Sequence, residues 1–341
     1  MNLEKGLISV VMSNYNTHEE YLRPAIESIL NQTYRNFEFI IIDDCSTDNS
    51  LQIIESYSDK RIKIIKNEQN LGITKSLNKG LAVAKGEFIA RMDSDDIAFP
   101  TRFEKQIEFL KSNPEHIVCG TGIELIGEWE KKHSNKYICR TIPKKYEFQI
   151  NLLFGNFPNI AHPTAMFNHR LLKKHNILYD EKYPLSQDYK MWISCSKYYE
   201  CANLPETLLY YRVHKQAVST AKQTLQRNVA LQIMQEQLNK LNIELSNEYE
   251  DIHMGLLFGR KKYNPKIKLW IKTIINQNKK YKIYDHKKLK KVLWSKWTET
   301  VYFEIAKAKT LNKIKALLTL PLFCYPDLLN IYNKRSTKKR K

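Results

Sequence analysis

Short apolar runs alternate with amphipathic stretches over the first 120 residues of the chain. Runs rich in Ile, Val and Phe predict four strands, at residues 7–12, 37–42, 61–66 and 87–92. The second run, FEFIII, is apolar enough to be buried on both faces, as parallel strands are. Helical periodicity predicts helices after these strands, at residues 19–31, from about 48, at 73–85 and from 100. This alternation predicts a doubly wound α/β domain with a mostly parallel sheet.

The pattern becomes less regular after residue 140. HPTAMF (162–167) predicts a short strand, QDYKMWISCSKYY (187–199) a helix, and LPETLLYYRVH (204–214) a strand that ends in a histidine. Helical patterns dominate beyond residue 221, beginning with a polar amphipathic stretch at 224–245. A mainly helical C-terminal region therefore follows the α/β domain.

Polar clusters follow three of the predicted strands, where open α/β sheets bind ligands. They are SNYN after the first strand, DDCSTD after the second and DSDD after the fourth. In the last cluster, Asp93, Asp95 and Asp96 supply the hard oxygen ligands that Mg²⁺ or Mn²⁺ prefers, and such ions are often shared with substrate phosphates. The alternative is an exposed acidic turn that caps the helix beginning at Pro100.

The cluster DDCSTD has a similar ambiguity. Thr47 or Asp48 is expected to cap the next helix. The adjacent Asp43 and Asp44 need another explanation, and a carboxylate that accepts an N–H of a nucleotide base is a reasonable one. Tyr15 of SNYN is then available to stack on that base.

Charge divides the chain into two parts. The formal net charge is +19, yet residues 1–220 contain 28 Lys and Arg against 27 Asp and Glu, whereas residues 221–341 contain 27 against 9. We therefore predict two domains, 1–220 and 221–341, the second with a surface for an acidic partner. The six cysteines include no Cys-x-x-Cys pair, which favours a reducing, cytoplasmic compartment. The N-terminus is expected to be a strand, not a signal peptide.

Taken together and in order, these motifs resemble the family-2 inverting glycosyltransferases of the GT-A fold. The resemblance covers about residues 6–215, and its later part is similar to enzymes that build bacterial surface polysaccharides and lipooligosaccharides. It rests on ISVVMSNYN, YLRPAIESILNQTY, FIIIDDCSTDNS, the long segment from NEQNLGITKS to DSDDIAFPTRFEKQ, HPTAMF, QDYKMW and LPETLLYYRVH.

The resemblance implies a role for each matching residue. The nucleotide pocket, usually for a UDP-sugar, corresponds to Ser13, Tyr15, Asp43 and Asp44. Asp93 and Asp95 correspond to the DxD pair; Asp93 lies near the ribose or the ion, and Asp95 binds Mn²⁺ or Mg²⁺. His214 corresponds to a group near the metal or diphosphate, while Lys75 and Arg91 contact phosphate or stabilise the acidic loop.

Asp188 corresponds to the general base that removes the proton from the acceptor hydroxyl. The family usually has two consecutive acids here, and this chain has Gln187 before Asp188. Helix capping by Asp188 and a solvated strand end at His214 are the alternatives. Trp192, one turn after Asp188, is either a core residue or a platform for the acceptor, and His162 is assigned to the acceptor side.

The basic C-terminal region matches no specific family. Residues 305–320, IAKAKTLNKIKALLTL, predict an amphipathic helix with a lysine face, which suits an anionic membrane surface. A helical subdomain with a solvated lysine face is the alternative, and nucleic acid is a less suitable partner. Since no run of about 18 apolar residues occurs, we expect peripheral attachment to the cytoplasmic face of the plasma membrane.

The sequence thus predicts a metal-assisted transfer of sugar from a nucleotide sugar to a glycan or a lipid-linked glycan. One rival is a sugar nucleotidyltransferase, which would normally have a Gly-rich basic loop after the first strand, where this chain has SNYNTHEE. Another is a non-catalytic membrane- or nucleic-acid-binding protein that retains the fold.

Overall fold

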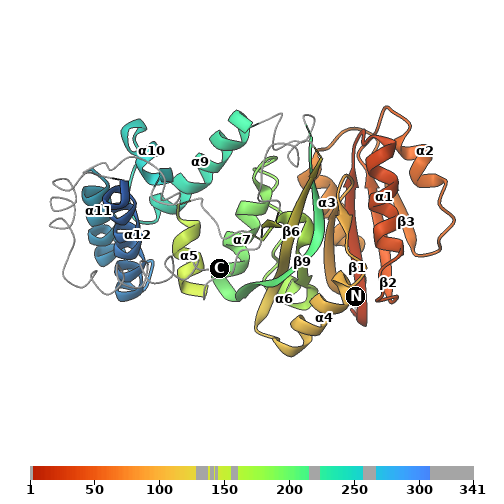
Figure 1. Ribbon diagram of the computed structural model, residues 1–341, viewed down its shortest axis with the longest axis horizontal. Helices are drawn as coiled ribbons and strands as arrows, with labels where there is room; N and C mark the ends of the chain where they lie inside the picture. Colours follow the sequence, from red (N-terminus) through yellow and green to blue (C-terminus); the bar gives the residue numbers. More distant parts are fainter. Residues whose placement is uncertain are drawn as a thin grey trace. The chain divides into compact units, whose positions relative to one another are not determined.

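The computed structural model describes residues 3–127, 137–138, 142, 145–154, 160–214, 223–255 and 266–307. These residues cluster into two compact units (Figure 1). The first comprises residues 1–145 and 158–229, and the second residues 146–157 and 230–341. The predicted division at 220/221 thus differs from this clustering, which assigns residues 221–229 to the first unit and residues 146–157 to the second.

One mixed sheet organises the first unit. Its strands are β1 (Glu4–Asn14), β2 (Phe37–Asp43), β3 (Ile62–Lys66), β4 (Gly86–Asp93), β5 (Ile97–Ala98), β6 (His116–Gly127), β7 (Tyr137–Ile138), β8 (Met166–Asn168) and β9 (Glu200–Val213). The order is β3-β2-β1-β4-β8-β6-β9-β5, and β7 pairs with β6. The four predicted strands form the parallel half, β3-β2-β1-β4, which confirms the predicted GT-A-like architecture for this half.

The helices of the first unit are α1 (Glu19–Leu30), α2 (Ser50–Glu55), α3 (Ile73–Val83), α4 (Arg102–Ser112), α5 (Lys145–Leu152, of which only the first residue falls in this unit), α6 (His169–Lys174) and α7 (Gln187–Tyr198). Five of them were predicted, α1, α2, α3, α4 and α7, and α5 and α6 have no predicted counterpart. α3 packs against β1 and β2, while α4 packs against β6 and β9 (Figure 1). The α3–sheet contact is tight at Gly80, where a Cβ would lie 2.5 Å from Cγ1 of Val11.

The parallel register brings the polar clusters together. Ser13 on β1 lies opposite Asp93 on β4, and Asn14 lies opposite Asp43 on β2. All seven residues of β2 are buried, as its apolar sequence predicts. The carboxyl ends of three adjacent strands therefore meet at one edge of the sheet.

The other half of the sheet differs from the predictions, and its short strands β5 and β7 have no predicted counterpart. HPTAMF is only partly a strand, because His162–Thr164 form a 3₁₀ turn and β8 begins at Met166. β6 has no counterpart among the predicted elements, although it is the strand that joins β8 to β9.

The second unit is helical. Besides the 146–157 segment, it contains the part of α9 (Gln223–Asn239) from Ala230 onward, α10 (Asn247–Gly255), α11 (Lys266–Tyr281) and α12 (His286–Lys307). α9 ends six residues before the predicted 245. The core includes Trp270, Trp294 and Trp297, so these tryptophans are interior residues. Of the predicted amphipathic helix at 305–320, residues from 308 onward lie outside the described ranges.

Among the described residues, no helix is both long enough and apolar enough to cross a membrane.

Candidate functional site

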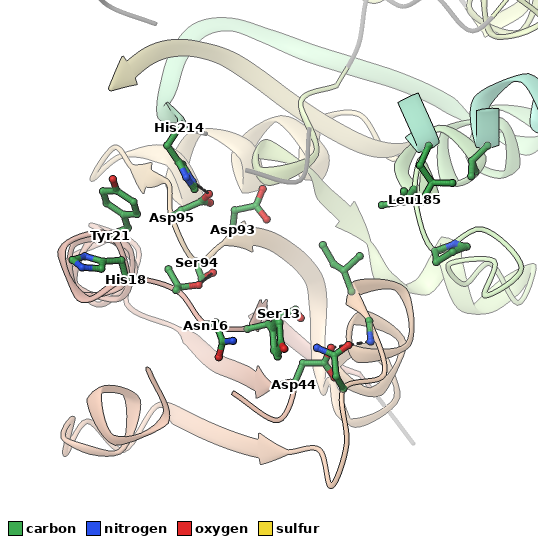
Figure 2. A pocket seen from close by; sticks show the side chains of 18 residues that line it. Ser13, Asn16, His18, Tyr21, Asp44, Asp93, Ser94, Asp95, Leu185 and His214 are labelled. Atoms are coloured by element: carbon green, nitrogen blue, oxygen red, sulfur yellow. Dashed lines mark hydrogen bonds and ion pairs between the residues drawn. The ribbon is translucent and has the colours of Figure 1, made fainter. Parts of the chain in front are cut away.

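A pocket of about 630 Å³ lies at the carboxyl ends of β1, β2 and β4 (Figure 2). The three clusters that the sequence places after these strands all contribute to its lining, together with apolar residues from elsewhere in the chain. It is lined by Ser13, Tyr15, Asn16, Thr17, His18, Tyr21, Asp44, Asn70, Gly72, Ile73, Asp93, Ser94, Asp95, Pro184, Leu185, His214, Leu225 and Val229. The pocket lies within the first unit.

Asp43 and Asp44 have different environments. Asp43 is buried and accepts hydrogen bonds from Nδ2 of Asn14 (3.0 Å) and from the backbone N–H and hydroxyl of Ser46 (3.1 and 2.6 Å). It does not line the pocket, so its carboxylate fixes the loop after β2. The assignment of Asp43 to direct nucleotide contact is therefore corrected: its oxygens already serve the loop.

Asp44 does line the pocket. Its Oδ1 accepts hydrogen bonds from Nδ2 of Asn67 (2.7 Å) and the N–H of Leu71 (2.8 Å), and its Oδ2 accepts one from the N–H of Gly72 (2.8 Å). These bonds hold the segment before α3 against the end of β2. Tyr15 also lines the pocket and is 48% exposed, so its ring is available to a flat ligand.

Arg91 lies beneath the acidic loop. Its guanidinium is 2% exposed and forms an ion pair with Asp93, the last residue of β4. Arg91 does not line the pocket, so of its two predicted roles the structure favours stabilising the acidic loop over contacting phosphate. Lys75, the other predicted phosphate contact, is exposed on α3 and is not part of the lining either.

Asp95 is held by the end of β9. Its Oδ2 lies 3.0 Å from Nε2 of His214, and its backbone oxygen accepts a hydrogen bond from Nε of Arg212 (2.8 Å). The ring of Tyr21 packs against both, with its centroid 4.5 Å from Cζ of Arg212 and 5.2 Å from the His214 ring centroid. Figure 2 shows His214 directed at Asp95. The last strand and the acidic loop, 119 residues apart, thus form one group.

Asp96 is buried next to them. Its Oδ1 accepts a hydrogen bond from the backbone N–H of Arg212 (2.8 Å), whereas its Oδ2 has no hydrogen-bond partner among the described residues. One carboxylate oxygen from each of Asp93, Asp95 and Asp96 lies within 4.8 Å of the others. Burial raises the pKa of both Asp93 and Asp96, and the neighbouring Asp95 carboxylate raises both further. This donor set fits a divalent cation, which would offset the mutual repulsion.

Asp188 lies in the first turn of α7, three residues after Leu185 of the pocket wall. Its Oδ1 accepts the N–H of Tyr189 at 2.8 Å. Burial raises the pKa of Asp188, while this hydrogen bond and the charge of Arg91 oppose the increase. Its charge in turn raises the pKa of Asp93, so the two carboxylates are electrostatic neighbours.

The two predicted acceptor residues are interior residues. Trp192 is 0% exposed and stacks on Phe167 with ring centroids 5.8 Å apart. His162 is buried edge-on to Trp192, and its Nε2 lies 2.7 Å from the hydroxyl of Tyr179. Burial lowers the pKa of His162 well below its ordinary value. Neither side chain lines the pocket, so the structure favours the core alternative for Trp192 and gives no support to an acceptor contact by His162.

Sequence reasoning missed several lining residues. Thr17 and Ser94 join the first and third clusters through a hydroxyl–hydroxyl hydrogen bond of 2.7 Å. Arg212 lies within the motif LPETLLYYRVH, so its position next to His214 could have drawn attention to it. Leu225 and Val229, from the start of α9, carry no chemical signal in the sequence.

Comparisons with known proteins agree with this geometry. A model of the family "Glycosyl transferase family 2" matches residues 9–175. An uncharacterized glycosyltransferase of Haemophilus influenzae is 37% identical over 256 residues, which cover 70% of this chain and 76% of that protein. The UDP-Glc:alpha-D-GlcNAc-diphosphoundecaprenol beta-1,3-glucosyltransferase WfaP of Escherichia coli is 32% identical over 63% of this chain and 81% of its own length.

The fold has a counterpart among solved structures. The crystal structure of S. aureus TarS 1-349 in complex with UDP-GlcNAc superposes with a TM-score of 0.57 at 18% identity, over 91% of this chain and 88% of that one. At this identity the likeness concerns the fold.

Proposed function

The chain belongs to glycosyl transferase family 2, and from this premise we propose that it is an inverting enzyme that moves a sugar from a UDP-sugar to a hydroxyl of a glycan or lipid-linked glycan in the synthesis of a surface polysaccharide. The observation that carries the proposal is one pocket that contains Asp44, Asp93, Asp95 and His214. A uridine diphosphate sugar needs a base-binding end and an anion-binding end, and this pocket offers both.

The base-binding end is formed by Ser13, Tyr15 and Asp44. The Tyr15 ring stacks on the uracil, and Ser13 and the Asp44 loop contact the base and ribose. Asp44 is buried and fixed by three hydrogen bonds, so this end is formed before the donor arrives. The relative WfaP, whose name specifies UDP-Glc, supports a uridine donor.

The anion-binding end is formed by Asp93, Asp95 and His214, which would hold a Mn²⁺ or Mg²⁺ ion. When bound, the ion neutralises charge on the diphosphate and on the departing UDP. Arg91 supports this end from below, because its ion pair fixes Asp93 at the end of β4. Tyr21 and Arg212 fix the Asp95 and His214 groups in the same way.

Asp188 acts as the general base. Its carboxylate takes the proton from the acceptor hydroxyl while that oxygen bonds to the anomeric carbon, and the bond from that carbon to the diphosphate oxygen breaks with its electron pair. UDP leaves on the opposite face, so the configuration inverts. The raised pKa of Asp188 makes it a stronger base than an exposed aspartate. The glutamine before it leaves Asp188 as the single acid at this position.

We place the enzyme at an anionic membrane surface through its C-terminal region. The α11–α12 turn, which comprises the end of α11 and the residues that follow it, presents the exposed lysines Lys279, Lys280 and Lys282 and the partly exposed apolar side chains of Tyr281 and Ile283. Lysines next to apolar side chains suit a bilayer with acidic headgroups better than they suit nucleic acid.

Vesicle sedimentation tests this placement. Full-length protein should bind vesicles that contain phosphatidylglycerol and not pure phosphatidylcholine, and charge reversal of the three turn lysines should weaken binding. Reversal of the α6 lysines, Lys173 and Lys174, is the control. Equal binding by both variants would exclude the α11–α12 turn.

A screen of UDP-sugars tests the function itself. Purified enzyme should be stabilised thermally by UDP with Mn²⁺, and one UDP-sugar should give UDP release. Absence of any effect of UDP, with or without Mn²⁺, would contradict the assignment of the pocket.

A further inference from the structure

The pocket has an apolar wall on one side. Pro184, Leu185, Leu225 and Val229 form it, and all four lie beyond residue 175, where the family match ends. Figure 2 shows Leu185 on the side of the pocket away from Tyr21. Leu225 is 54% exposed, although a leucine gains from burial. A diphosphate and its ion have no use for such a wall, so it serves another part of the reaction.

Ser186 connects the α9 part of this wall with the segment that carries the predicted base, Asp188. Its backbone has a φ of 56°, in the left-handed region that a non-glycine residue enters only when its surroundings hold it there. Its hydroxyl donates a hydrogen bond of 3.2 Å to the backbone oxygen of Gln226, between the two α9 residues of the wall. Asp188 follows two residues after Ser186, in the first turn of α7. The first turn of α9 is thereby fixed next to the segment that presents Asp188.

These contacts identify the ligand that the wall receives. A general base must lie within hydrogen-bond reach of the hydroxyl that it deprotonates, so the acceptor sugar must lie beside Asp188. A hexose has a face of C–H groups that packs on aliphatic side chains, and the wall offers such side chains next to Asp188.

We infer that the first two turns of α9 complete the acceptor site: Leu225 and Val229, with Leu185, pack against the C–H face of the acceptor hexose, and the bond from Ser186 to Gln226 positions Asp188 for it. This inference rests on the proposed role of Asp188. It makes Leu225 a residue that determines acceptor binding and Ser186 a positioning residue.

Kinetics of Leu225 variants test the wall. The probes are UDP-glucose and UDP-N-acetylglucosamine as donors with Mn²⁺, and a panel of nitrophenyl α- and β-hexosides as acceptors. In Leu225→Asn the KM for the best hexoside should rise about tenfold, because a polar side chain replaces the apolar contact, and this increase should exceed any increase in the Kd for UDP. Leu269→Asn is the matched control, since Leu269 is 57% exposed on α11.

Three outcomes would overturn the proposal that the apolar wall binds the acceptor. They are an unchanged acceptor KM in Leu225→Asn, an equal increase in the Kd for UDP, and failure of the wild-type enzyme to accept any hexoside of the panel while it hydrolyses the donor. Failure of the proposed function has a different signature, because the wild-type enzyme would then release UDP from neither donor.

Substitution of Ser186 tests the positioning. Ser186→Gly keeps the backbone conformation accessible but removes the hydroxyl. As a result kcat should fall about five- to tenfold and the acid limb of its pH profile should shift, with the donor KM unchanged. Ser186→Asn tolerates the left-handed region and offers a side-chain N–H, so it should recover part of kcat. Full activity of Ser186→Gly, or equal losses in both variants with no shift of the pH profile, would contradict the positioning role.

Discussion

Removal of the buried charge of Arg91 should destabilise the first unit strongly. Arg91→Met keeps much of the side-chain volume but leaves Asp93 without its positive partner, close to Asp95, Asp96 and Asp188. Breaking one side of a fully buried ion pair costs about 3–5 kcal/mol, because the other charge stays buried and uncompensated. The Asp93 side chain is 28% exposed, so this range is an upper bound for Arg91→Met. Arg23→Met is the matched control: Arg23 is exposed and pairs with Glu19 one helical turn away, a contact that solvent screens.

Hydrogen–deuterium exchange measures this loss within the first unit. Peptides from β2, which is buried throughout, report its opening, and peptides from α11 serve as an internal reference. A loss of 3–5 kcal/mol corresponds to an increase in the opening equilibrium of about 150-fold to several thousand-fold. The reference peptides should not change.

The cause can be separated from a packing defect. Burial and neighbouring carboxylates raise the pKa of Asp93, so the folded protein binds its proton more tightly than the unfolded chain. The contribution of Asp93 to the free energy of unfolding therefore increases as the pH falls towards its unfolded pKa of about 4. The difference in unfolding free energy between Arg91→Met and the wild type should consequently be smaller at pH 5 than at neutral pH. Adding Asp93→Asn should restore much of the lost unfolding free energy. The reasoning would be refuted if Arg91→Met lost no more unfolding free energy than Arg23→Met does. It would also be refuted if Asp93→Asn restored none of the loss.

Three further predictions follow from buried contacts. Gly80→Ala should destabilise the first unit by about 1–3 kcal/mol, measured by the same exchange experiment, because the new Cβ would lie 2.5 Å from Cγ1 of Val11; full stability would contradict this packing. Burial lowers the pKa of His253 to about 4, so the second unit should lose about 3 kcal/mol of unfolding free energy as the pH falls from about 6.5 to about 4. Hydrogen exchange of peptides from α10 and α11 should show this pH dependence. His253→Gln should abolish it, and the control His286→Gln should not. The acid limb of the pH profile of kcat/KM should have an apparent pKa above about 4, the ordinary value for aspartate, because Asp188 must be ionised and its pKa is raised. An apparent pKa at or below about 4 would count against Asp188 as the base.

The parallel half of the sheet was predictable because its signals are local. Each strand is an apolar run, each helix is amphipathic, and both patterns reflect burial of the residues concerned. β6 was not predictable in the same way. Its sequence, HIVCGTGIELIG, contains three glycines and a glutamate, and its stability comes from pairing with β8 and β9, which lie far along the chain.

The acidic site was predictable as a cluster but not as a set of individual roles. Three polar segments after adjacent parallel strands must meet at one edge, and they do. Asp43 is the last residue of β2, however, and Asp44 lies just beyond it, so strand alternation does not say where the Asp44 side chain points. The sequence alone does not say which of them faces the ligand; the bonds from Asn14 and Ser46 decide it.

The acceptor side was the least predictable part. Trp192 follows Asp188 by four residues, a spacing that places both on one helix face, yet Phe167 covers the Trp192 ring. Leu225 looks like an ordinary helical leucine. Its contribution to the pocket depends on how α9 packs beside Ser186, a contact between residues 40 apart.

The most direct test of the account compares Asp95→Asn with Asp188→Asn in UDP binding and sugar transfer, each measured with Mn²⁺. The account predicts that Asp95→Asn weakens Mn²⁺-dependent UDP binding. It predicts that Asp188→Asn binds UDP as the wild type does and yet transfers sugar at least about a hundredfold more slowly, the lower end of what a general base contributes. Transfer by Asp188→Asn at the wild-type rate would contradict the central claim that this carboxylate is the base.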